Sequence, residues 1–478
     1  MQTYLISKIG QNKGAPRLWL EGNRPLRAGF EPGARYTVEA IKDRSSIILR
    51  VADTGPRVVS RKERSGREVP VIDINSQELL AMFEGMESVR VIMRDREIHI
   101  LPLATETRKK ERVERLSGKL AAGQPISVGS LSHGGGVLSH AMHEGLQAAG
   151  LDVELAFAND IRPELLDQAE AHNDAWDGKT AYVAAPMQEL AYDEWAATHL
   201  PKVDILEAGI PCSGASVAGR AKRGLGHPEE HPEVGHLVVA FLSIISRVNP
   251  AVICLENVPQ YQNTASMSII RTSLREMGYN LHERVLNGAE WNLLEHRQRM
   301  CLVAVTEGIE FDFDALGRPE PQARTMSEIL EDVPLDDPRW SPMTGLKAKE
   351  ERDKAAGKGF RMQIVTGEDD HIPTLTKGIA KNRSTDPKIR HPENPGLLRL
   401  PTPVEHARAK GVPEELIQGL CATTAHELLG QSICYTPFFS VARLIGEAIT
   451  KWRRDLSSVS AKFAAMAAPA TPEPSFEF

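Results

Sequence analysis

The sequence is poor in residues that define several common protein classes. It has only 5 cysteines among 478 residues, at positions 212, 254, 301, 421 and 434, and none forms a Cys-x-x-Cys pair. Such few and scattered cysteines argue against a disulfide framework and a zinc site, and they favour a reducing cytoplasm. No apolar run approaches the roughly 18 residues of a membrane span. Residues 1–14 lack the apolar core of a secretion signal.

The charge of the chain is unevenly distributed. The net charge is −7, yet the first 115 residues hold 22 Lys/Arg against 16 Asp/Glu, and the remainder holds 35 against 48. A basic front on an acidic body favours an accessory nucleic-acid contact, with a merely solvated basic surface as the alternative. At about 150 residues per domain, the length predicts two or three domains.

Residues 1–106 are predicted to form a small β domain. Short β-branched segments alternate with turns: RLWLEG, ARYTVEAI, SSIILRVA, SVRVIMR and EIHILPL. The pattern GFEPGARYTVEAI…SIILRV is echoed by MFEGMESVRVIMRDREIHILPL. The first copy resembles SymE-like proteins of the AbrB (swapped-hairpin) superfamily, which implies DNA binding or dimerisation. A plain accessory domain without a DNA role remains the alternative. Residues 107–124, TRKKERVERLSGKLAAGQ, predict a charged, solvated helical linker.

Three apolar strands downstream each carry reactive side chains at one end. VDILEAGI stops at Pro211-Cys212, AVICLENV ends in Glu256-Asn257, and RQRMCLVAV begins with two arginines. Ligands of open α/β sheets bind at the carboxyl edge, so we expect these groups to meet there. Each signal alone is weak, because a lone cysteine is more often a buried structural residue.

A nucleotide-binding unit precedes these strands. ISVGSL, SHGGG and VLSHAMHEGLQAAG predict a strand, a glycine-rich turn and a helix, and the glycines let a backbone approach a ligand closely. VELAFAND then ends in Asp160, at the interval where a carboxylate binds ribose hydroxyls. KTAYVAAPMQEL predicts a third strand. The pattern predicts a Rossmann-like α/β sheet.

In this order, the segments from about Pro125 to Trp452 resemble the DNA cytosine-5 methyltransferase family. The resemblance implies an S-adenosylmethionine-dependent methyltransferase sheet with a small irregular target recognition domain. It implies catalytic roles for Cys212, Glu256, Arg297 and Arg299; cofactor contacts from Leu131, Gly134, Gly135, Gly136, Asp160, Ile161, Met187, Pro211, Gln431 and Ser432; substrate contacts from Ser213, Ser216 and Asn257; and no metal.

The sequence departs from the family pattern at several of these positions. Gly129 and Leu131 replace an acidic residue and an aromatic of the first motif, and Pro186-Met187 replace an aspartate that reads adenine. Glutamines of the family are replaced by Ser213 after the Pro-Cys step and by Glu295 before the arginines. The family's Gly-Asn-Ser stands here as Gly430-Gln431-Ser432.

The expected domain boundaries follow from these motifs. RLPTPVEHARAKGVP and LLGQSICYTPFFSVARLIGEAI resemble motifs IX and X, which return the chain to the catalytic domain. The expected segments are 1–106 (β domain), 107–124 (linker), 125–310 (catalytic domain), 311–398 (target recognition domain), 399–456 (return to the catalytic domain) and 457–478 (an Ala/Pro-rich, disordered tail).

The hypothesis is methylation of carbon 5 of cytosine in a specific duplex sequence, through a Cys212 adduct and base flipping. RNA cytosine-5 methylation is one alternative. A non-catalytic DNA-binding regulator with a degenerate methyltransferase body is another. The expected partners are double-stranded DNA, a cognate restriction endonuclease and a second copy bound through the β domain, with no membrane. The irregularly spaced His227, His231 and His236 do not predict a metal site.

Overall fold

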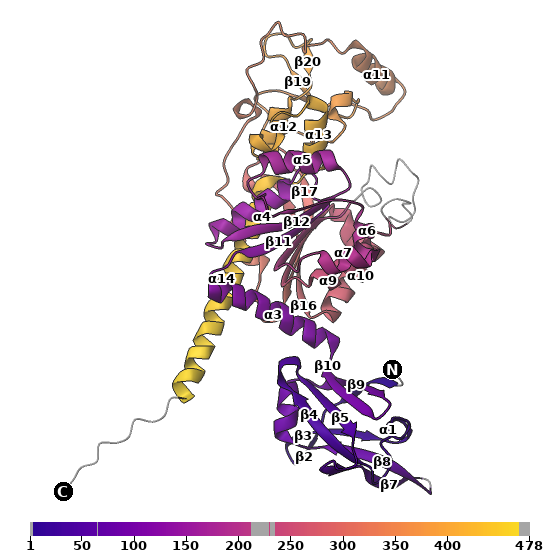
Figure 1. Ribbon diagram of the computed structural model, residues 1–478. Coiled ribbons are helices and arrows are strands. Elements are labelled where there is room, and N and C mark those ends of the chain that lie inside the picture. Colours follow the sequence, from indigo (N-terminus) through magenta and orange to yellow (C-terminus); the bar gives the residue numbers. More distant parts are fainter. Residues whose placement is uncertain (1–2, 65, 212–228, 230–234, 468–478) are drawn as a thin grey trace, which may run out of the picture. The chain divides into compact units, whose positions relative to one another are not determined.

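The computed structural model describes residues 3–64, 66–211, 229 and 235–467 (Figure 1). The chain divides into two compact units, Met1–Glu111 and Arg112–Phe478. Among the helices of the described residues, none is long and apolar enough to cross a membrane.

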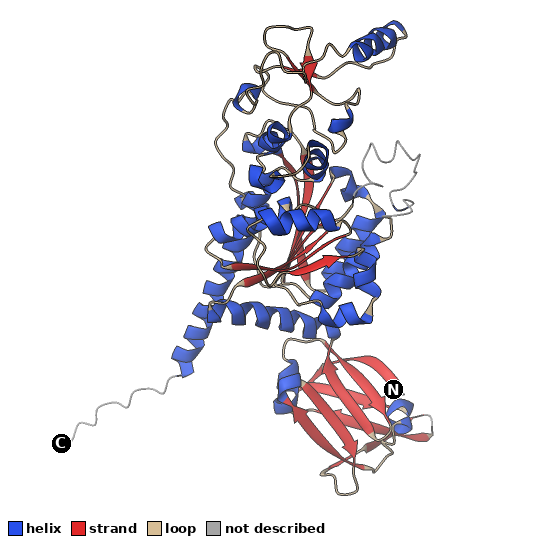
Figure 2. Ribbon diagram, turned by 45° about the horizontal axis from the view of Figure 1, so that its top comes forward, coloured by secondary structure: helices blue, strands red, loops and turns tan. Residues whose placement is uncertain are grey.

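The N-terminal unit consists of two antiparallel sheets (Figure 2). The six-stranded sheet has the order β1 (Thr3–Lys8), β9 (Ser88–Arg94), β10 (Glu97–Pro102), β5 (Ser46–Val51), β4 (Arg35–Ile41) and β6 (Arg57–Val58). The four-stranded sheet has the order β2 (Gly10–Asn12), β3 (Ala15–Glu21), β8 (Arg67–Ile74) and β7 (Ser60–Arg64). Two short helices, α1 (Asn23–Arg27) and α2 (Gln77–Leu80), complete it. The predicted all-β region is thus present.

The sequence repeat corresponds to a structural repeat. Its two copies form the hairpins β4–β5 and β9–β10, which are joined where β5 pairs with β10 and Leu49 lies opposite Ile98. Phe30 and Phe83, which precede the two hairpins, are buried in the same core. The two copies therefore share one sheet and one core. The relation to the AbrB superfamily stays a prediction.

The second unit is built on a seven-stranded sheet. Its order is β13 (Ala181–Ala184), β12 (Val153–Asp160), β11 (Ile126–Leu131), β14 (Ile205–Gly209), β15 (Val252–Asn257), β17 (Gln298–Thr306) and β16 (Tyr279–Asn287). The first five strands are parallel, and β17 runs antiparallel to both neighbours. This confirms the predicted Rossmann-like sheet. The order reverses at β11 and β14, which is where such sheets bind ligands.

Helices cover both faces of this sheet (Figures 1 and 2). One core lies under α4 (Val137–Ala148), α5 (Pro163–His172) and α14 (Tyr435–Ala467). The other lies under α6 (Met187–Tyr192), α7 (Glu194–His199), α9 (Leu237–Val248) and α10 (Ala265–Glu276). Because both faces are covered, all six residues of β11 are buried.

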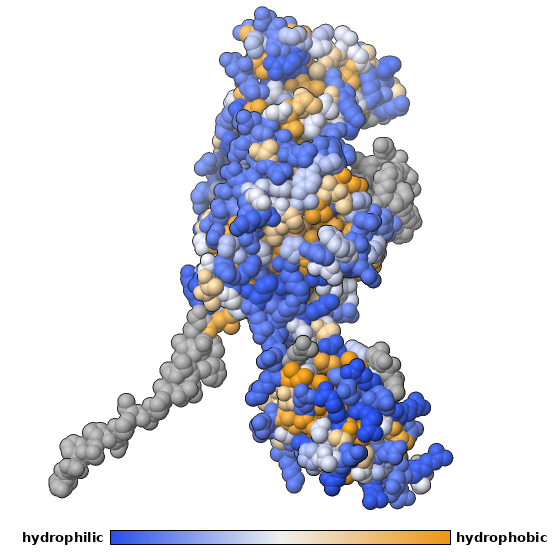
Figure 3. Space-filling model, in the orientation of Figure 1, coloured by the Kyte–Doolittle hydropathy of each residue, from blue (hydrophilic) through white to orange (hydrophobic). Residues whose placement is uncertain are grey.

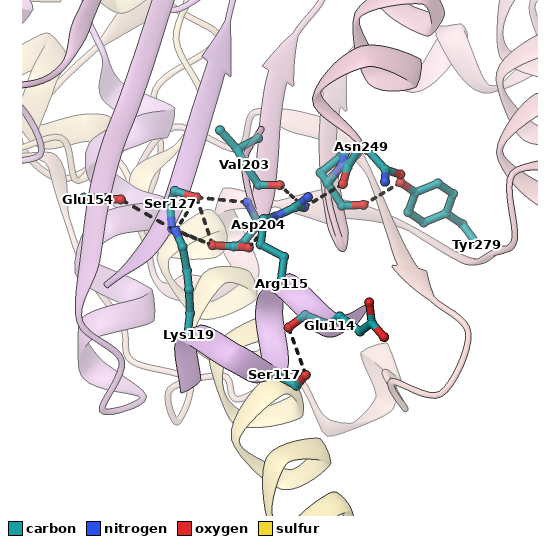
Figure 4. A network of polar contacts seen from close by, with 11 residues as sticks. Glu114, Arg115, Ser117, Lys119, Ser127, Glu154, Val203, Asp204, Asn249 and Tyr279 are labelled. Carbon is teal, nitrogen blue, oxygen red and sulfur yellow. Dashed lines mark hydrogen bonds and ion pairs between the residues drawn. The ribbon is translucent and has the colours of Figure 1, made fainter. Parts of the chain in front are cut away.

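Helix α3 (Ala104–Ala122) differs from the solvated linker that its charges predict. Arg112, Leu116 and Leu120 are buried. Arg115 and Lys119 reach the buried Asp204 at the start of β14, with nitrogen–oxygen distances of 3.0 and 2.9 Å (Figure 4). The division between the two units falls inside the helix, after residue 111, because its second half packs on the seven-stranded sheet.

The C-terminal part contains the least regular region. Between β17 and α12 (Pro403–Lys410) lie α11 (Thr344–Ala355) and a small sheet of β18 (Ile364–Val365), β19 (Lys388–Arg390) and β20 (Leu398–Arg399). Helix α13 (Ala422–Gln431) leads into α14, which continues to Ala467. The predicted tail, 457–478, thus begins within the range of α14, and residues 468–478 lie outside the described part of the chain.

Candidate active site

The direction of β17 explains how residues from three strands meet at one edge. β14 and β15 end there, with Gly209 opposite Glu256, and the antiparallel β17 begins there. Arg299 Nε lies 2.7 Å from Glu256 Oε1, and the two side chains are only 13% and 12% exposed. The predicted carboxylate and one predicted arginine thus form a nearly buried ion pair.

The surroundings of Glu256 favour its protonated form. Burial raises the pKa of Glu256 above its ordinary value, while the charges of Arg299, Arg297 and Lys410 oppose that rise. A carboxyl that retains its proton more readily than usual, held in place by a guanidinium group, suits donation of a hydrogen bond or proton to a ring nitrogen.

The predicted nucleophile Cys212 lies outside the described residues, as do Ser213 and Ser216. The segment that leads to it is described, and Pro211 is exposed there. Asn257 is buried and donates from Nδ2 to the carbonyl of Ile210 at 3.1 Å, while its Oδ1 accepts from Val258 N at 2.9 Å. The Asn257 amide therefore braces the end of β14 and has both polar atoms engaged within the protein.

The two arginines of the motif have different surroundings. Arg297 is buried, donates from Nη2 to the carbonyl of Gly430 at 3.0 Å, and lies 3.7 Å from Glu295. Arg299, not Arg297, contacts Glu256 directly. Arg299 therefore lies against Glu256 at the sheet edge, whereas Arg297 is bound to the end of α13.

The glycine turn forms the other part of the site. Gly134 has φ +57° and donates its N–H to Asp160 Oδ2 at 2.8 Å. Gly136, at φ +76°, is the N-cap of α4, and Leu131 is buried at the end of β11. A Cβ on Gly135 would lie 2.2 Å from a methyl carbon of Leu428, so α13 packs directly on the turn. The glycine turn and the segment that resembles motif X therefore meet.

The remaining predicted cofactor residues divide into two groups. Ile161 follows Asp160 and is 67% exposed, an uncovered apolar side chain beside a carboxylate at the ligand-binding edge. Gln431 is also exposed, and Ser432 donates to the Leu429 carbonyl at 2.8 Å. Met187 is different, because its side chain is buried in the core under α6. A close backbone, a carboxylate and an open apolar surface fit a nucleoside cofactor.

A buried carboxyl group that the motifs do not include lies on β14. Glu207 is buried, and its Oε1 has no hydrogen-bond partner. Burial, with the charge of Glu256 acting in the same direction, raises the pKa of Glu207 to about 8. The only sequence signal is a carboxylate inside the apolar run VDILEAGI.

A chain of hydrogen bonds leads to Glu207. Trp176 Nε1 donates to His133 Nε2 at 3.1 Å, and His133 Nδ1 lies 2.8 Å from Ser130 Oγ. Because an indole N–H can only donate, His133 Nε2 must accept, so the proton is on Nδ1 and points to Ser130. The Ser130 hydroxyl then donates to Glu207. Glu207 therefore has one satisfied oxygen and one without a partner.

The doubly wound sheet carries the glycine turn, Asp160 and the Glu256–Arg299 pair at one edge. This arrangement is typical of an enzyme that binds a nucleotide cofactor. The family described as C-5 cytosine-specific DNA methylase matches residues 134–450. The chain belongs to this family. Its activity is DNA cytosine-5 methylation, with S-adenosylmethionine as the methyl donor.

Individual relatives agree with this assignment. The type II methyltransferase M.NlaX of Neisseria lactamica is 26% identical over 316 residues, 64% of this chain and 93% of that protein. The type II methyltransferase M.MspI of Moraxella sp is 27% identical over 264 residues, 53% of this chain and 58% of that protein. The solved structure of the S. pombe Dnmt2 methyltransferase matches with a TM-score of 0.50 at 18% identity, over 70% of this chain and 99% of that one, and shows the shared fold.

Of the three histidines noted in the sequence, His227 and His231 lie outside the described residues. Within the described ranges, no group of three or more His, Cys, Asp or Glu side chains is placed to hold a metal ion.

Proposed function

We propose that the chain methylates cytosine within a specific duplex sequence through a covalent adduct between Cys212 and carbon 6 of a flipped base. The observation that carries this proposal is the Glu256–Arg299 ion pair at the sheet edge where β14 ends, because Pro211 and then Cys212 follow β14 in the sequence. A base inside a duplex cannot reach such a recessed pair, so the target leaves the helix.

The side chains divide the chemistry between them. The Cys212 thiolate adds to carbon 6, Glu256 gives a proton or hydrogen bond to ring nitrogen N3, and Arg299 holds the ring carbonyl oxygen. The addition makes carbon 5 nucleophilic. Bound S-adenosylmethionine supplies an electrophilic methyl group. Loss of the carbon 5 proton to a base then lets the Cys212–carbon 6 bond break, which returns the thiolate.

Residues around the glycine turn would hold the cofactor. Asp160 accepts backbone N–H bonds from Gly134 and Arg162 and keeps lone pairs for ribose hydroxyls. Ile161 offers its open apolar surface to the adenine. Adenine recognition at Met187 falls to the backbone, because that side chain is buried in the core.

The N-terminal unit contacts DNA in this proposal. All residues of β7 are exposed and include Arg61, Lys62 and Arg64. The end of the unit where Figure 1 labels β7 and β8 is largely hydrophilic in Figure 3. Trp19, next to Lys62 and with Arg17 4.2 Å from its ring centroid, adds an aromatic surface. A cytoplasmic site of action, a cognate endonuclease and dimerisation through this unit complete the proposal.

Two experiments test the covalent mechanism. Bisulfite sequencing of DNA from a host that expresses the protein should reveal one methylated sequence, and Cys212→Ser should remove it while DNA binding persists. Duplex DNA with 5-fluorocytosine at that site should trap the wild-type protein only when S-adenosylmethionine is present, and matched RNA should not. Methylation that survives Cys212→Ser would eliminate the adduct.

A further inference from the structure

Three ionisable side chains are buried near the Glu256–Arg299 pair. Glu295, Arg297 and Lys410 are at most 6% exposed. Glu295 Oε1 lies 3.7 Å from Arg297 Nη1, and its Oε2 lies 3.9 Å from Lys410 Nζ. One carboxylate thus lies between two cations, one from the segment before β17 and the other from the end of α12.

Both cations bind the end of α13. Lys410 Nζ donates to the carbonyls of Leu429 and, at 3.3 Å, Ser432. Arg297 Nη2 donates to the carbonyl of Gly430 at 3.0 Å. The last carbonyls of a helix have no partner within the helix and carry its negative dipole end, so cations are favoured there. The end of α13 is therefore fastened from two directions.

The backbone of Glu295 is held equally firmly. Its N–H donates to Ala409 O at 3.0 Å, and its carbonyl accepts from Cys434 Sγ at 3.6 Å. Neither carboxylate oxygen of Glu295 has a hydrogen-bond partner, although both are buried. The carboxylate therefore acts on its neighbours by charge, and its two closest charged neighbours are Arg297 and Lys410.

The charge balance of this cluster gives a physical reason for Glu295, which stands where the family has a glutamine. A neutral glutamine there would leave Arg297 and Lys410 buried together without the nearest counter-ion, and an unpaired buried charge is costly. Burial lowers the pKa of Lys410 to about 7, and the charge of Glu295 opposes that fall, so the ammonium form of Lys410 depends on Glu295. The other ionisable groups facing Lys410 are Arg299 and Cys434, with His406 beside them. His406 is deeply buried, and burial lowers its pKa well below the ordinary value, so it adds no positive charge at neutral pH.

We propose that Glu295 and Lys410 are positioning residues for methyl transfer. Their ion pair fixes Arg297, and through the chain from 297 to 299 it holds Arg299 against Glu256. The same pair ties this segment to the end of α13, which carries Gln431 and Ser432, the residues predicted to contact the cofactor. This inference rests on the proposed function, since it assigns Arg299 and Glu256 to the reacting edge.

The test compares single and double neutral variants of the full chain. Glu295→Gln and Lys410→Gln should each lower kcat by about tenfold to a hundredfold, because small displacements of a reacting group have effects of this size. The KM for DNA should stay within about threefold, since neither side chain contacts DNA. The double variant Glu295→Gln/Lys410→Gln restores the charge balance and should recover kcat to within about fivefold of wild type. Glu283→Gln, which removes the ion pair of Arg271 on α10 with β16, is the matched control.

The outcomes separate this inference from the function. A wild-type protein without methyl transfer to unmethylated genomic DNA would refute the proposed function itself. An active wild type with both single variants at normal kcat would overturn the positioning role. A folded double variant as slow as the single variants would do the same. If the single variants fail to fold while the double variant folds and turns over, the coupling of the two residues is supported.

Discussion

Glu207 on β14 and Glu256 on β15 are two buried or nearly buried carboxyl groups that differ in their partners. Glu256 has the guanidinium group of Arg299 at 2.7 Å, whereas Glu207 has only a serine hydroxyl, and its Oε1 has no hydrogen-bond partner. Each carboxyl has a raised pKa, but only Glu256 has a cation that opposes the rise. At neutral pH Glu207 is therefore predominantly protonated.

The raised pKa of Glu207 predicts a pH dependence of stability. The folded protein keeps this proton up to about pH 8, whereas the unfolded chain releases it near its ordinary value of 4.5. The stabilisation is complete below that value and is lost as the pH rises through 8. Each pH unit inside this window removes up to about 1.4 kcal/mol of unfolding free energy.

Glu207→Gln should flatten that dependence, because an amide does not titrate. Urea denaturation between pH 5 and 8 measures it. The control Glu283→Gln should retain the wild-type slope. A Glu207→Gln slope equal to the wild-type slope would mean that Glu207 is ionised in the folded protein.

At the scale of elements, α4 and α14 approach closely because glycines lie between them. A Cβ on Gly145 would lie 2.4 Å from the Phe439 carbonyl oxygen, and a Cβ on Gly446 would lie 2.6 Å from the side-chain Cβ of Ala149. This contact brings the C-terminal helix against the helix that follows the glycine turn. The same region places Leu428 of α13 on Gly135.

Two helix-interior glycines give a matched pair of substitutions. Gly145→Ala should destabilise the protein by about 1–3 kcal/mol, because the methyl group overlaps a backbone carbonyl. Gly118→Ala in α3 should stabilise it by about 0.5–1 kcal/mol, because a Cβ there has open space and alanine favours helix. Denaturant titration measures both, and equal effects would contradict the close approach of α4 and α14.

At the scale of the whole molecule, the second half of α3, from Arg112 on, belongs to the methyltransferase unit. Asp204 has Arg115 and Lys119 as partners, and it also accepts from the backbone and hydroxyl of Ser127 (Figure 4). Arg112 donates to Thr306 and to two backbone carbonyls, and its guanidinium carbon lies 3.8 Å from the Tyr279 ring centroid. A boundary at residue 124 would remove all three of these basic side chains.

Two truncations test this division. A protein that starts at Ala104 should fold and bind S-adenosylmethionine like the full chain, with weaker DNA binding and a shallower salt dependence because fewer phosphates are neutralised. A protein that starts at Pro125 should lose a further 3–5 kcal/mol or so of stability, because Asp204 stays buried without its cations. Thermal melting and salt-titrated DNA binding measure these effects. Equal melting of the two would show that α3 is dispensable, and an unchanged salt slope would remove the DNA role of the N-terminal unit.

The sequence by itself determined the strands, the glycine turn and the polar ends of β14 and β15. Those features are local: apolar runs predict buried strands, and a Pro-Cys step or a terminal Glu-Asn marks where each strand stops. The catalytic family was likewise readable from the order of these segments, because it depends on residue types and spacing.

Only the tertiary structure decided which side chains meet. Arg297 and Arg299 are two residues apart, but Arg299 lies in β17 against Glu256, whereas Arg297 lies before the strand begins and donates to the carbonyl of Gly430. The charges of α3 predicted solvation, yet three of its basic side chains bind the sheet. Lys410 and Glu295 are distant in sequence, and only the packing of α12 on the segment before β17 makes them a pair. Burial and long-range pairing depend on the arrangement of whole elements, which local residue patterns do not encode.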